Sequence, residues 1–272
     1  MGPGVAQVFA GAGHSTYLFH HKDIKKAQKG IDIINNNISR LVERGKMDVL
    51  DKESLLERIA PSAQMGDASS CDLVIEVIAE DLEVKKNFFT EIDKLCKPDV
   101  ILATCTSSLS ITELAKAVTK QERFIGLHFF NPAPVMKLVE IIKGRKTSDD
   151  TTNTIISICK SIGKDPIEIM DSPGFVVNRV LMLMINEAIH ILNEGVASSE
   201  DIDTAMRLGA GHPIGPLALS DFIGNDIVLS IMNTIYDETG NSKFHPAPLL
   251  KKMVRAGRLG KKSTSGFYEY SQ

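Results

Sequence analysis

The sequence lacks the features that mark membrane-spanning, nucleic-acid-binding and disulfide-bonded proteins. No apolar run reaches the ~20 residues that a helix needs to cross a bilayer. No basic block stands out, and the net charge of −3 argues against a nucleic acid or a membrane surface as the partner. The 4 cysteines form neither a Cys-x-x-Cys pair nor a zinc pattern, so we expect free thiols, no metal site and a reducing compartment. These absences predict a soluble intracellular protein.

The chain does contain enough apolar sequence for a sizeable core. Its 272 residues are 43% hydrophobic, which suits one large domain or two medium ones. Apolar β-branched runs at 73–77 and 100–103 are typical of strands buried on both faces. Helical patterns separate them. The first ~170 residues therefore predict an α/β domain, a doubly wound and mainly parallel sheet with helices on both faces.

Local patterns predict where the elements of this first domain lie. In chain order we expect a helix over 4–10, a strand over 16–19, a long helix running toward residue 45, a helix over 51–58, a strand over 73–77, a helix over 84–95, a strand over 100–103 and a capped helix opening near residue 110.

The character of the sequence changes after Pro173 and Gly174. Residues 175–192 predict one long helix that is apolar around most of its circumference, and further helices begin near Ser199 and Gly215. A helix that is apolar all round is buried, against its own domain or against a second copy of it. We therefore expect two domains, 1–171 and an all-helical 172–272, with a homodimer formed through the second.

The stretch 127–142 is mostly apolar, yet it contains His128 and Glu140. Residues 124–127 and 135–142 are of strand type, and the Asn-Pro-Ala-Pro between them must turn the chain, because proline fixes φ and has no N–H. Such a turn can bring the two side chains within hydrogen-bond distance. A carboxylate that holds one imidazole nitrogen leaves the other available as a general base. On these residues alone, a core histidine with an unrelated exposed glutamate explains the pattern equally well.

The glycines near the start give an incomplete dinucleotide motif. A doubly wound sheet seats a pyrophosphate on a glycine-rich turn at a helix N-terminus. Gly2 and Gly4 stand directly before the first expected helix, as the tail of such a turn would, but no strand or earlier glycine precedes them in this sequence. The Gly-Ala-Gly at 11–13 follows a helix and precedes a strand, the wrong order, so we interpret it as a helix C-cap.

Four longer stretches are specific enough to compare with known families. They are Thr-Ser-Ser-Leu-Ser-Ile-Thr at 106–112, His-Phe-Phe-Asn-Pro at 128–132, Pro-Gly-Phe-Val-Val-Asn-Arg at 173–179 and Glu-Asp-Ile-Asp-Thr-Ala-Met at 200–206. In this order they resemble the 3-hydroxyacyl-CoA dehydrogenases, especially the short-chain 3-hydroxybutyryl-CoA type. The resemblance covers essentially the whole chain. It implies a Rossmann-type NAD-binding domain, here lacking its first strand, followed by a helical dimerisation domain.

The resemblance implies an activity and the residues that perform it. The reaction would be oxidation of (S)-3-hydroxyacyl-CoA to 3-oxoacyl-CoA with NAD, in the cytoplasm or, alternatively, in the mitochondrial matrix. His128 matches the base that takes the proton of the 3-hydroxyl group, and Glu140 matches the carboxylate that orients it. Ser107 and Asn178 match groups that hydrogen-bond the substrate near the reacting oxygen.

The resemblance also implies a set of cofactor contacts, which have plainer explanations from the residues alone. The matching positions are Gly2, Gly4, Glu80, Lys85, Ser107, Asn131 and, from the C-terminal domain, Lys262. Ser107 can equally cap the helix that opens near residue 110. Asn178 can be a buried amide that bonds a neighbouring helix. Glu80 and Lys85 lie at an expected helix start, where both charges can simply be solvated.

Three departures from the family concern the cofactor side. The missing first strand would leave two inner strands of the sheet without a neighbour. His20 or His21 stands where the family has the acid that binds the adenosine ribose, with Asp23 the nearest acid, so the choice between NAD and NADP is open. Cys105 replaces an asparagine, and a thiol is a weaker hydrogen-bond partner than an amide. These departures motivate a rival hypothesis, a non-catalytic protein of the same fold that dimerises and binds acyl-CoA without effective NAD binding.

Overall fold

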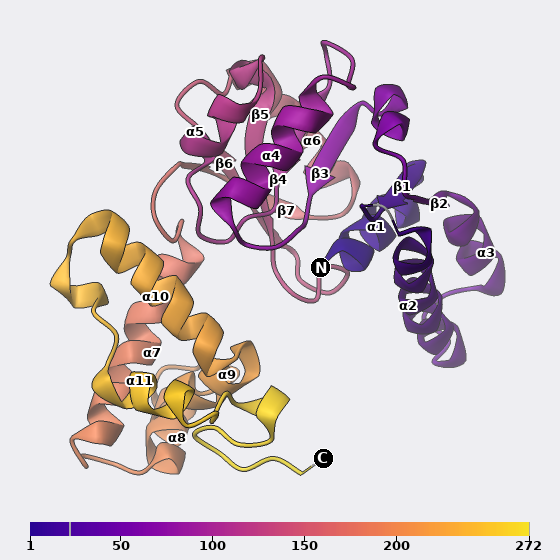
Figure 1. Cartoon of the computed structure of the whole chain (residues 1–272). Helices are drawn as coiled ribbons and strands as arrows, with labels where there is room; N and C mark the ends of the chain where they lie inside the picture. Colours follow the sequence, from indigo (N-terminus) through magenta and orange to yellow (C-terminus); the bar gives the residue numbers. More distant parts are fainter. Residues whose placement is uncertain (22, 272) are drawn as a thin grey trace. The chain divides into compact units, whose positions relative to one another are not determined.

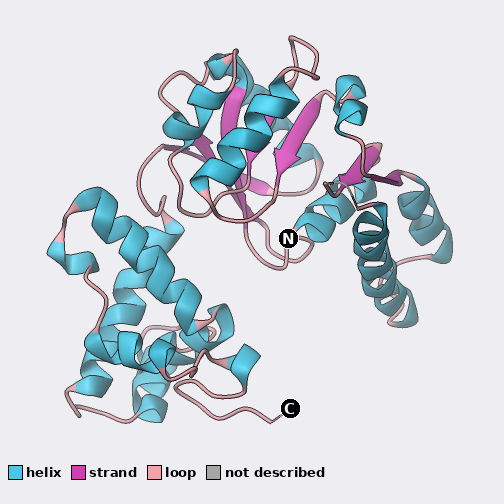
Figure 2. Cartoon of the chain, viewed as in Figure 1, coloured by secondary structure: helices cyan, strands magenta, loops and turns pink. Residues whose placement is uncertain are grey.

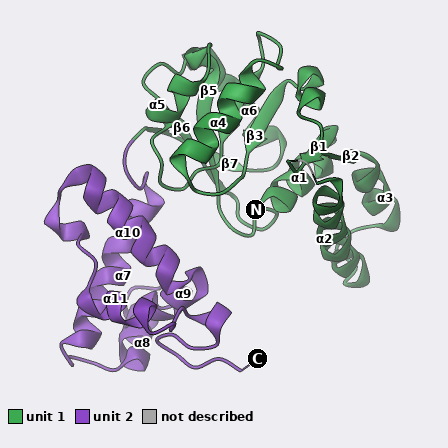
Figure 3. Ribbon diagram, viewed as in Figure 1, with its two compact units in different colours: residues 1–171 green, residues 172–272 purple. Residues whose placement is uncertain are grey.

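The computed structural model describes residues 1–21 and 23–271 (Figure 1). They form two compact units, Met1–Asp171 and Ser172–Gln272 (Figure 3). Strands and helices alternate in the first unit, whereas the regular elements described in the second are helices (Figure 2). The predicted fold class, a mainly parallel α/β sheet followed by a helical region, is confirmed. Among the described residues, no helix has both the length and the apolar character needed to cross a membrane.

The strands of the first unit lie in two sheets. The bounds are β1 Thr16–Phe19, β2 Ile59–Ser62, β3 Leu73–Glu76, β4 Ile101–Thr104, β5 Phe124–Phe129, β6 Leu138–Lys143 and β7 Asp165–Met170. β1 pairs with β2, and the larger sheet has the order β3-β4-β5-β6-β7. All these neighbours run parallel except β5 and β6, which are antiparallel. His128 lies inside β5 rather than after it, and β6 begins three residues later than predicted, because the turn with its two prolines extends to Lys137.

Helices cover both sheets. Those of the first unit are α1 Gly2–Gly11, α2 Ile24–Glu43, α3 Val49–Glu57, α4 Leu82–Asp93, α5 Ile111–Leu114 and α6 Asp149–Ser161. α1 belongs to two hydrophobic clusters. Val5 and Phe9 pack with the larger sheet, while Ala6 and Ala10 pack with α2 and α3. The short helix at the start of the chain therefore joins the two sheets of the unit.

A cavity separates the two sheets. Its volume is about 860 Å³, and β1 and β3 contribute all their residues to its wall, together with side chains from α1 and α4. Within the described chain, β1 and β3 each have a strand neighbour on one edge only. The prediction that two strands would lack a neighbour is thus confirmed. The prediction that 73–77 is buried on both faces is wrong, because Leu73, Val74 and Ile75 face this cavity and are only partly buried.

The second unit has its own core. Its helices are α7 Val177–Asn193, α8 Ser199–Gly209, α9 Pro216–Ile223, α10 Asn225–Thr239 and α11 Pro248–Arg255. Met182, Ile185 and Ile189 of α7 are fully buried in that core. Val180 of the same helix is 66% exposed. One face of α7 therefore makes the core of the described unit, and burial of the other face against a second copy stays a prediction.

Candidate active site

Three parallel strands bring the site together. β3, β4 and β5 run in the same direction, so the segments that follow Glu76, Thr104 and Phe129 meet at one edge of the sheet. In open α/β sheets this carboxyl edge is where ligands bind. Ser107 follows β4, and His128 is the penultimate residue of β5. Residues far apart in the sequence thus become neighbours through strand order alone.

His128 and Glu140 form a buried pair. They face each other in the antiparallel register of β5 and β6, and residues directly opposite project from the same face of a sheet. His128 Nδ1 lies 2.7 Å from Glu140 Oε2, and the glutamate has no exposed surface. A carboxylate only accepts hydrogen bonds, so in the neutral imidazole Nδ1 carries the hydrogen and the lone pair is on Nε2. The contact that the sequence allowed is present, and the reading of Glu140 as an unrelated exposed residue is wrong.

Ser107 occupies the other side of the imidazole. Its Oγ lies 3.1 Å from His128 Nε2. The short helix that follows is capped by Ser110 instead, whose side chain accepts from the Glu113 N–H. The capping explanation of Ser107 is therefore not what the structure shows. A hydroxyl next to the lone pair of Nε2 marks the place where a proton can be exchanged with the histidine.

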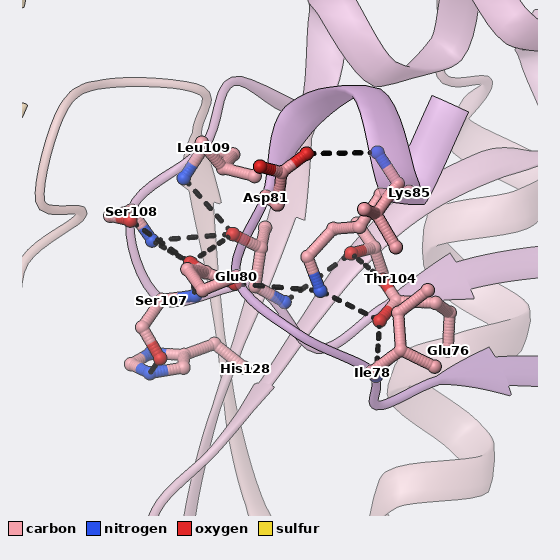
Figure 4. A network of polar contacts seen from close by, with 12 residues as sticks. Glu76, Ile78, Glu80, Asp81, Lys85, Thr104, Ser107, Ser108, Leu109 and His128 are labelled. Carbon is pink, nitrogen blue, oxygen red and sulfur yellow. Dashed lines mark hydrogen bonds and ion pairs between the residues drawn. The ribbon is translucent and has the colours of Figure 1, made fainter. Parts of the chain in front are cut away.

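Glu80 holds the loop that carries this serine (Figure 4). Its Oε1 accepts the backbone N–H groups of Ser107 and Ser108 at 2.9 and 3.0 Å. The same oxygen accepts the hydroxyl groups of Thr106 at 2.6 Å and of Ser108 at 2.9 Å. Burial alone would raise the pKa of Glu80, but the hydrogen bond from Thr106 and the nearby ammonium of Lys85 outweigh it and lower that pKa. Glu80 is thus a hydrogen-bonded carboxylate, although its side chain is 39% exposed.

Lys85 is also not a solvated charge. It is 1% exposed, and its Nζ lies 2.6 Å from Glu76 Oε1 and 3.4 Å from Glu80 Oε2. Sequence reasoning assigned no role to Glu76. The available signal was a glutamate at the end of an otherwise apolar strand, where a buried charge needs a partner.

The start of α1 lies beside the turn that follows β5. A Cβ added to Gly4 would lie 3.3 Å from Pro134 and 3.4 Å from Ala133, so glycine permits a close approach there. Asn131 lies in this turn and is exposed. The first backbone hydrogen bond of the helix is from Val5 N–H to Met1 C=O, so the N–H groups of Gly2 and Gly4 point beyond the helix start. Such a helix end favours an anion.

Two further positions predicted from the resemblance lie in the second unit. Asn178 in α7 is 9% exposed. Lys262 Nζ forms an ion pair with Asp226, at 2.6 Å from Oδ1. Both residues belong to the second unit, and their roles in the site stay predictions.

The structure describes two of the residues at which the sequence departs from the family on the cofactor side, Asp23 and Cys105. Asp23 caps α2, since its side chain accepts from the N–H groups of Lys25 and Lys26. One oxygen of its carboxylate is therefore engaged by the helix. Burial raises the pKa of Cys105 to about 11, so this residue is a neutral thiol at the end of β4.

Comparison with known proteins identifies the family. Profiles for the 3-hydroxyacyl-CoA dehydrogenase NAD binding domain and C-terminal domain match residues 1–172 and 174–270. The 3-hydroxybutyryl-CoA dehydrogenase of Clostridioides difficile is 48% identical over 272 residues, which cover 100% of this chain and 96% of the relative. The human mitochondrial hydroxyacyl-coenzyme A dehydrogenase is 42% identical, covering 99% of this chain and 88% of that protein.

A solved structure agrees with these relatives. The crystal structure of (S)-3-hydroxybutyryl-CoA dehydrogenase from Ralstonia eutropha superposes with a TM-score of 0.97 at 45% identity, covering 100% of this chain and 96% of that one. The resemblance predicted from the four sequence stretches is confirmed. The chain therefore belongs to the 3-hydroxyacyl-CoA dehydrogenase family, and its NAD-binding and C-terminal domains follow each other in the family's order.

Proposed function

We propose that the chain oxidises (S)-3-hydroxyacyl-CoA to 3-oxoacyl-CoA with NAD, and that 3-hydroxybutyryl-CoA is its short-chain substrate. The observation that carries this proposal is the buried imidazole of His128, bonded through Nδ1 to Glu140 and through Nε2 to Ser107. The names of relatives that cover almost the full chain support the choice of substrate. They do not favour the rival hypothesis of a non-catalytic protein.

Each side chain of the site has a separate role in removing the proton of the 3-hydroxyl group. His128 Nε2 accepts the proton of the 3-hydroxyl group, because its lone pair is directed away from Glu140. Glu140 orients the ring and stabilises the imidazolium that forms. Ser107 hydrogen-bonds the reacting oxygen, and Asn178 is proposed as a second donor to it. When bound, NAD accepts the hydride from C3.

The residues proposed to hold NAD fit a dinucleotide in part. The N–H groups at Gly2 and Gly4 suit its pyrophosphate, because they lie at a helix N-terminus. Glu80 and Lys85 lie after β3 at the carboxyl edge of the sheet, where the nicotinamide side is expected. Asn131 and Lys262 are assigned from the family resemblance. The adenosine ribose has no acid at the end of β1, so we expect a higher Kd for NAD than an intact fingerprint would give.

We also propose a homodimer, formed through the second unit, and a cytoplasmic location. Exposed apolar side chains in that unit support the dimer, since Leu208 is 82% exposed and Phe222 57% exposed. Light scattering would give the mass directly, and Leu208→Glu with Phe222→Glu would lower it if these side chains lie in the interface. Unchanged dimer mass in that double variant would place the interface elsewhere.

NADH formation by the purified chain tests the proposed activity. Absorbance at 340 nm should rise with (S)-3-hydroxybutyryl-CoA and NAD, and the (R) enantiomer should give no comparable rate. NADP in place of NAD, and acyl chains of increasing length, would define the preference. A folded chain that forms no NADH from any (S)-3-hydroxyacyl-CoA would contradict the proposal.

A further inference from the structure

Glu76 lies outside the chemistry proposed above, yet it is one of the most buried charged groups of the first unit. It is 1% exposed at the end of β3. Its Oε1 accepts from Lys85 Nζ and from the Ile78 N–H, each at 2.6 Å, and its Oε2 accepts from Thr104 Oγ1 at 2.7 Å. Because each oxygen accepts from a buried side chain, Lys85 or Thr104, this carboxylate has one position.

Lys85 connects this fixed carboxylate with a less constrained one. The Lys85 ammonium lies between Glu76 and Glu80, at 2.6 Å from the first and 3.4 Å from the second (Figure 4). The Glu80 side chain is 39% exposed, so packing alone does not fix its rotamer. The Lys85 ammonium is therefore one of the contacts that hold the Glu80 carboxylate, together with donors from the Ser107 loop. Glu76 in turn sets where the ammonium lies.

Glu80 then determines the position of the Ser107 loop. One oxygen of Glu80 gathers four donors from Thr106, Ser107 and Ser108. The same loop presents Ser107 Oγ to His128 Nε2. The contacts thus run without interruption from Glu76 through Lys85 and Glu80 to the hydroxyl beside the proposed base.

We propose that Glu76 is a positioning residue for Ser107, acting through Lys85 and Glu80. This inference rests on the proposed dehydrogenase function. Two carboxylates contact Lys85 in the described chain, those of Glu76 and Glu80. When Glu76 loses its charge, only the Glu80 carboxylate is left to pair with the Lys85 ammonium. The ammonium then draws Glu80 toward itself and away from the loop amides. Ser107 Oγ leaves its place beside His128, although neither residue has been altered.

Steady-state kinetics of Glu76→Gln test this role. The kcat should fall about 10- to 100-fold, because displacements of around 1 Å have effects of this size. Glu113→Gln is a matched control, since Glu113 lies 2.8 Å from Lys86, the next lysine of α4, on the surface. Its kcat should change less than about 2-fold, as expected for an exposed ion pair.

A double-mutant cycle separates positioning from a general structural role. In a Ser107→Ala background, Glu76→Gln should lower kcat by less than about 3-fold, because the hydroxyl that Glu76 positions is absent. An equal loss of kcat in both backgrounds would overturn the proposal, since Glu76 would then act on something other than Ser107.

Hydrogen exchange of the Ser107 and Ser108 amides tests the same series of contacts without turnover. We call this series, from Glu76 through Lys85 and Glu80 to the Ser107 loop, the relay. Both amides donate to Glu80 Oε1, so Glu76→Gln should speed their exchange by about 10-fold or more while Glu113→Gln leaves it unchanged. If the single variant folds poorly, Glu76→Gln with Lys85→Met removes the buried charges together and should still loosen the loop. Unchanged exchange in a folded variant would overturn the relay. If Glu76→Gln speeds exchange but the wild-type chain forms no NADH, the contacts from Glu76 to Ser107 act as proposed and the proposed dehydrogenase function is wrong.

Discussion

Two regions of the first unit differ in the burial of their strands and in the number of strand neighbours. Every residue of β4 and β5 is buried, and both strands have neighbours on each side. No residue of β1 is buried, and the cavity lies along it. The proposed proton-transfer groups belong to the first region, whereas the proposed adenosine side of the cofactor site belongs to the second. The comparison suggests that catalysis and cofactor binding respond separately to mutation.

Glu140→Gln tests the buried region that holds the proposed proton-transfer groups, and after the loss of His128 itself it should have the largest effect on kcat. An amide cannot stabilise the imidazolium of His128 as a carboxylate does, so kcat should fall by about 10²- to 10³-fold. Glu168→Gln on the neighbouring β7 is the control, because Glu168 makes an ion pair with Lys143 at 3.3 Å and is 44% exposed. A Glu140→Gln enzyme within about 3-fold of the wild-type kcat would remove the orienting role of this carboxylate.

Backbone amide exchange compares the local stability of the two regions directly. The amides of β1 and β2 should exchange about 100-fold faster than those of β4 and β5, which corresponds to ~2.7 kcal/mol less opening free energy. The reason is that one edge of β1 faces a cavity instead of a strand. Equal protection in the two sheets would mean that the cavity has no effect on local stability.

Acid should remove the contribution of Glu80 to stability. The folded chain lowers the pKa of Glu80 below its ordinary value of 4.5, so the unfolded chain binds this proton more readily. The stabilisation is therefore complete above the ordinary pKa and is lost as pH falls through the lowered one. The Tm difference between wild type and Glu80→Gln should be largest near neutral pH and shrink in acid. A difference that grew on acidification would have the wrong sign.

The smallest difference that we expect between the two regions is in the rate at which their cysteines are labelled. Burial raises the pKa of both Cys71 and Cys105, so neither is a reactive thiolate at neutral pH. Cys71 lines the cavity, whereas Cys105 directly follows β4. We expect Cys71 to react with iodoacetamide about 10-fold faster, as peptide mapping by mass spectrometry would show. Faster labelling of Cys105 would mean that the end of β4 opens before the cavity wall.

Much of this arrangement could be predicted from the sequence. Two strand-type runs around a proline-containing turn allowed His128 to meet Glu140, and the antiparallel register of the structure places the two residues opposite each other. The strand β1 was predicted at its observed bounds from a four-residue run of strand type. In these cases the local pattern and the tertiary environment favour the same structure.

Other features depend on contacts that no local pattern records. β2 contains Pro61 and spans four residues, so its strand character comes from pairing with β1. The pair of Glu76 and Lys85 joins a strand to a helix, and their spacing in the sequence gives no sign that both are buried. Likewise, four donors converge on one oxygen of Glu80 only because β3 and β4 end at the same edge.

The most direct test of the account is the rate of hydride transfer in His128→Ala, measured in a single turnover with (S)-3-hydroxybutyryl-CoA and NAD. We predict a loss of about 10²- to 10⁴-fold against wild type, the range typical of a missing general base. The Kd for NADH should stay close to its wild-type value, whereas the Tm should fall, because the buried Glu140 carboxylate loses its bond to the imidazole. A His128→Ala chain that transfers hydride within about tenfold of the wild-type rate would contradict the account, since proton removal would then not depend on this histidine.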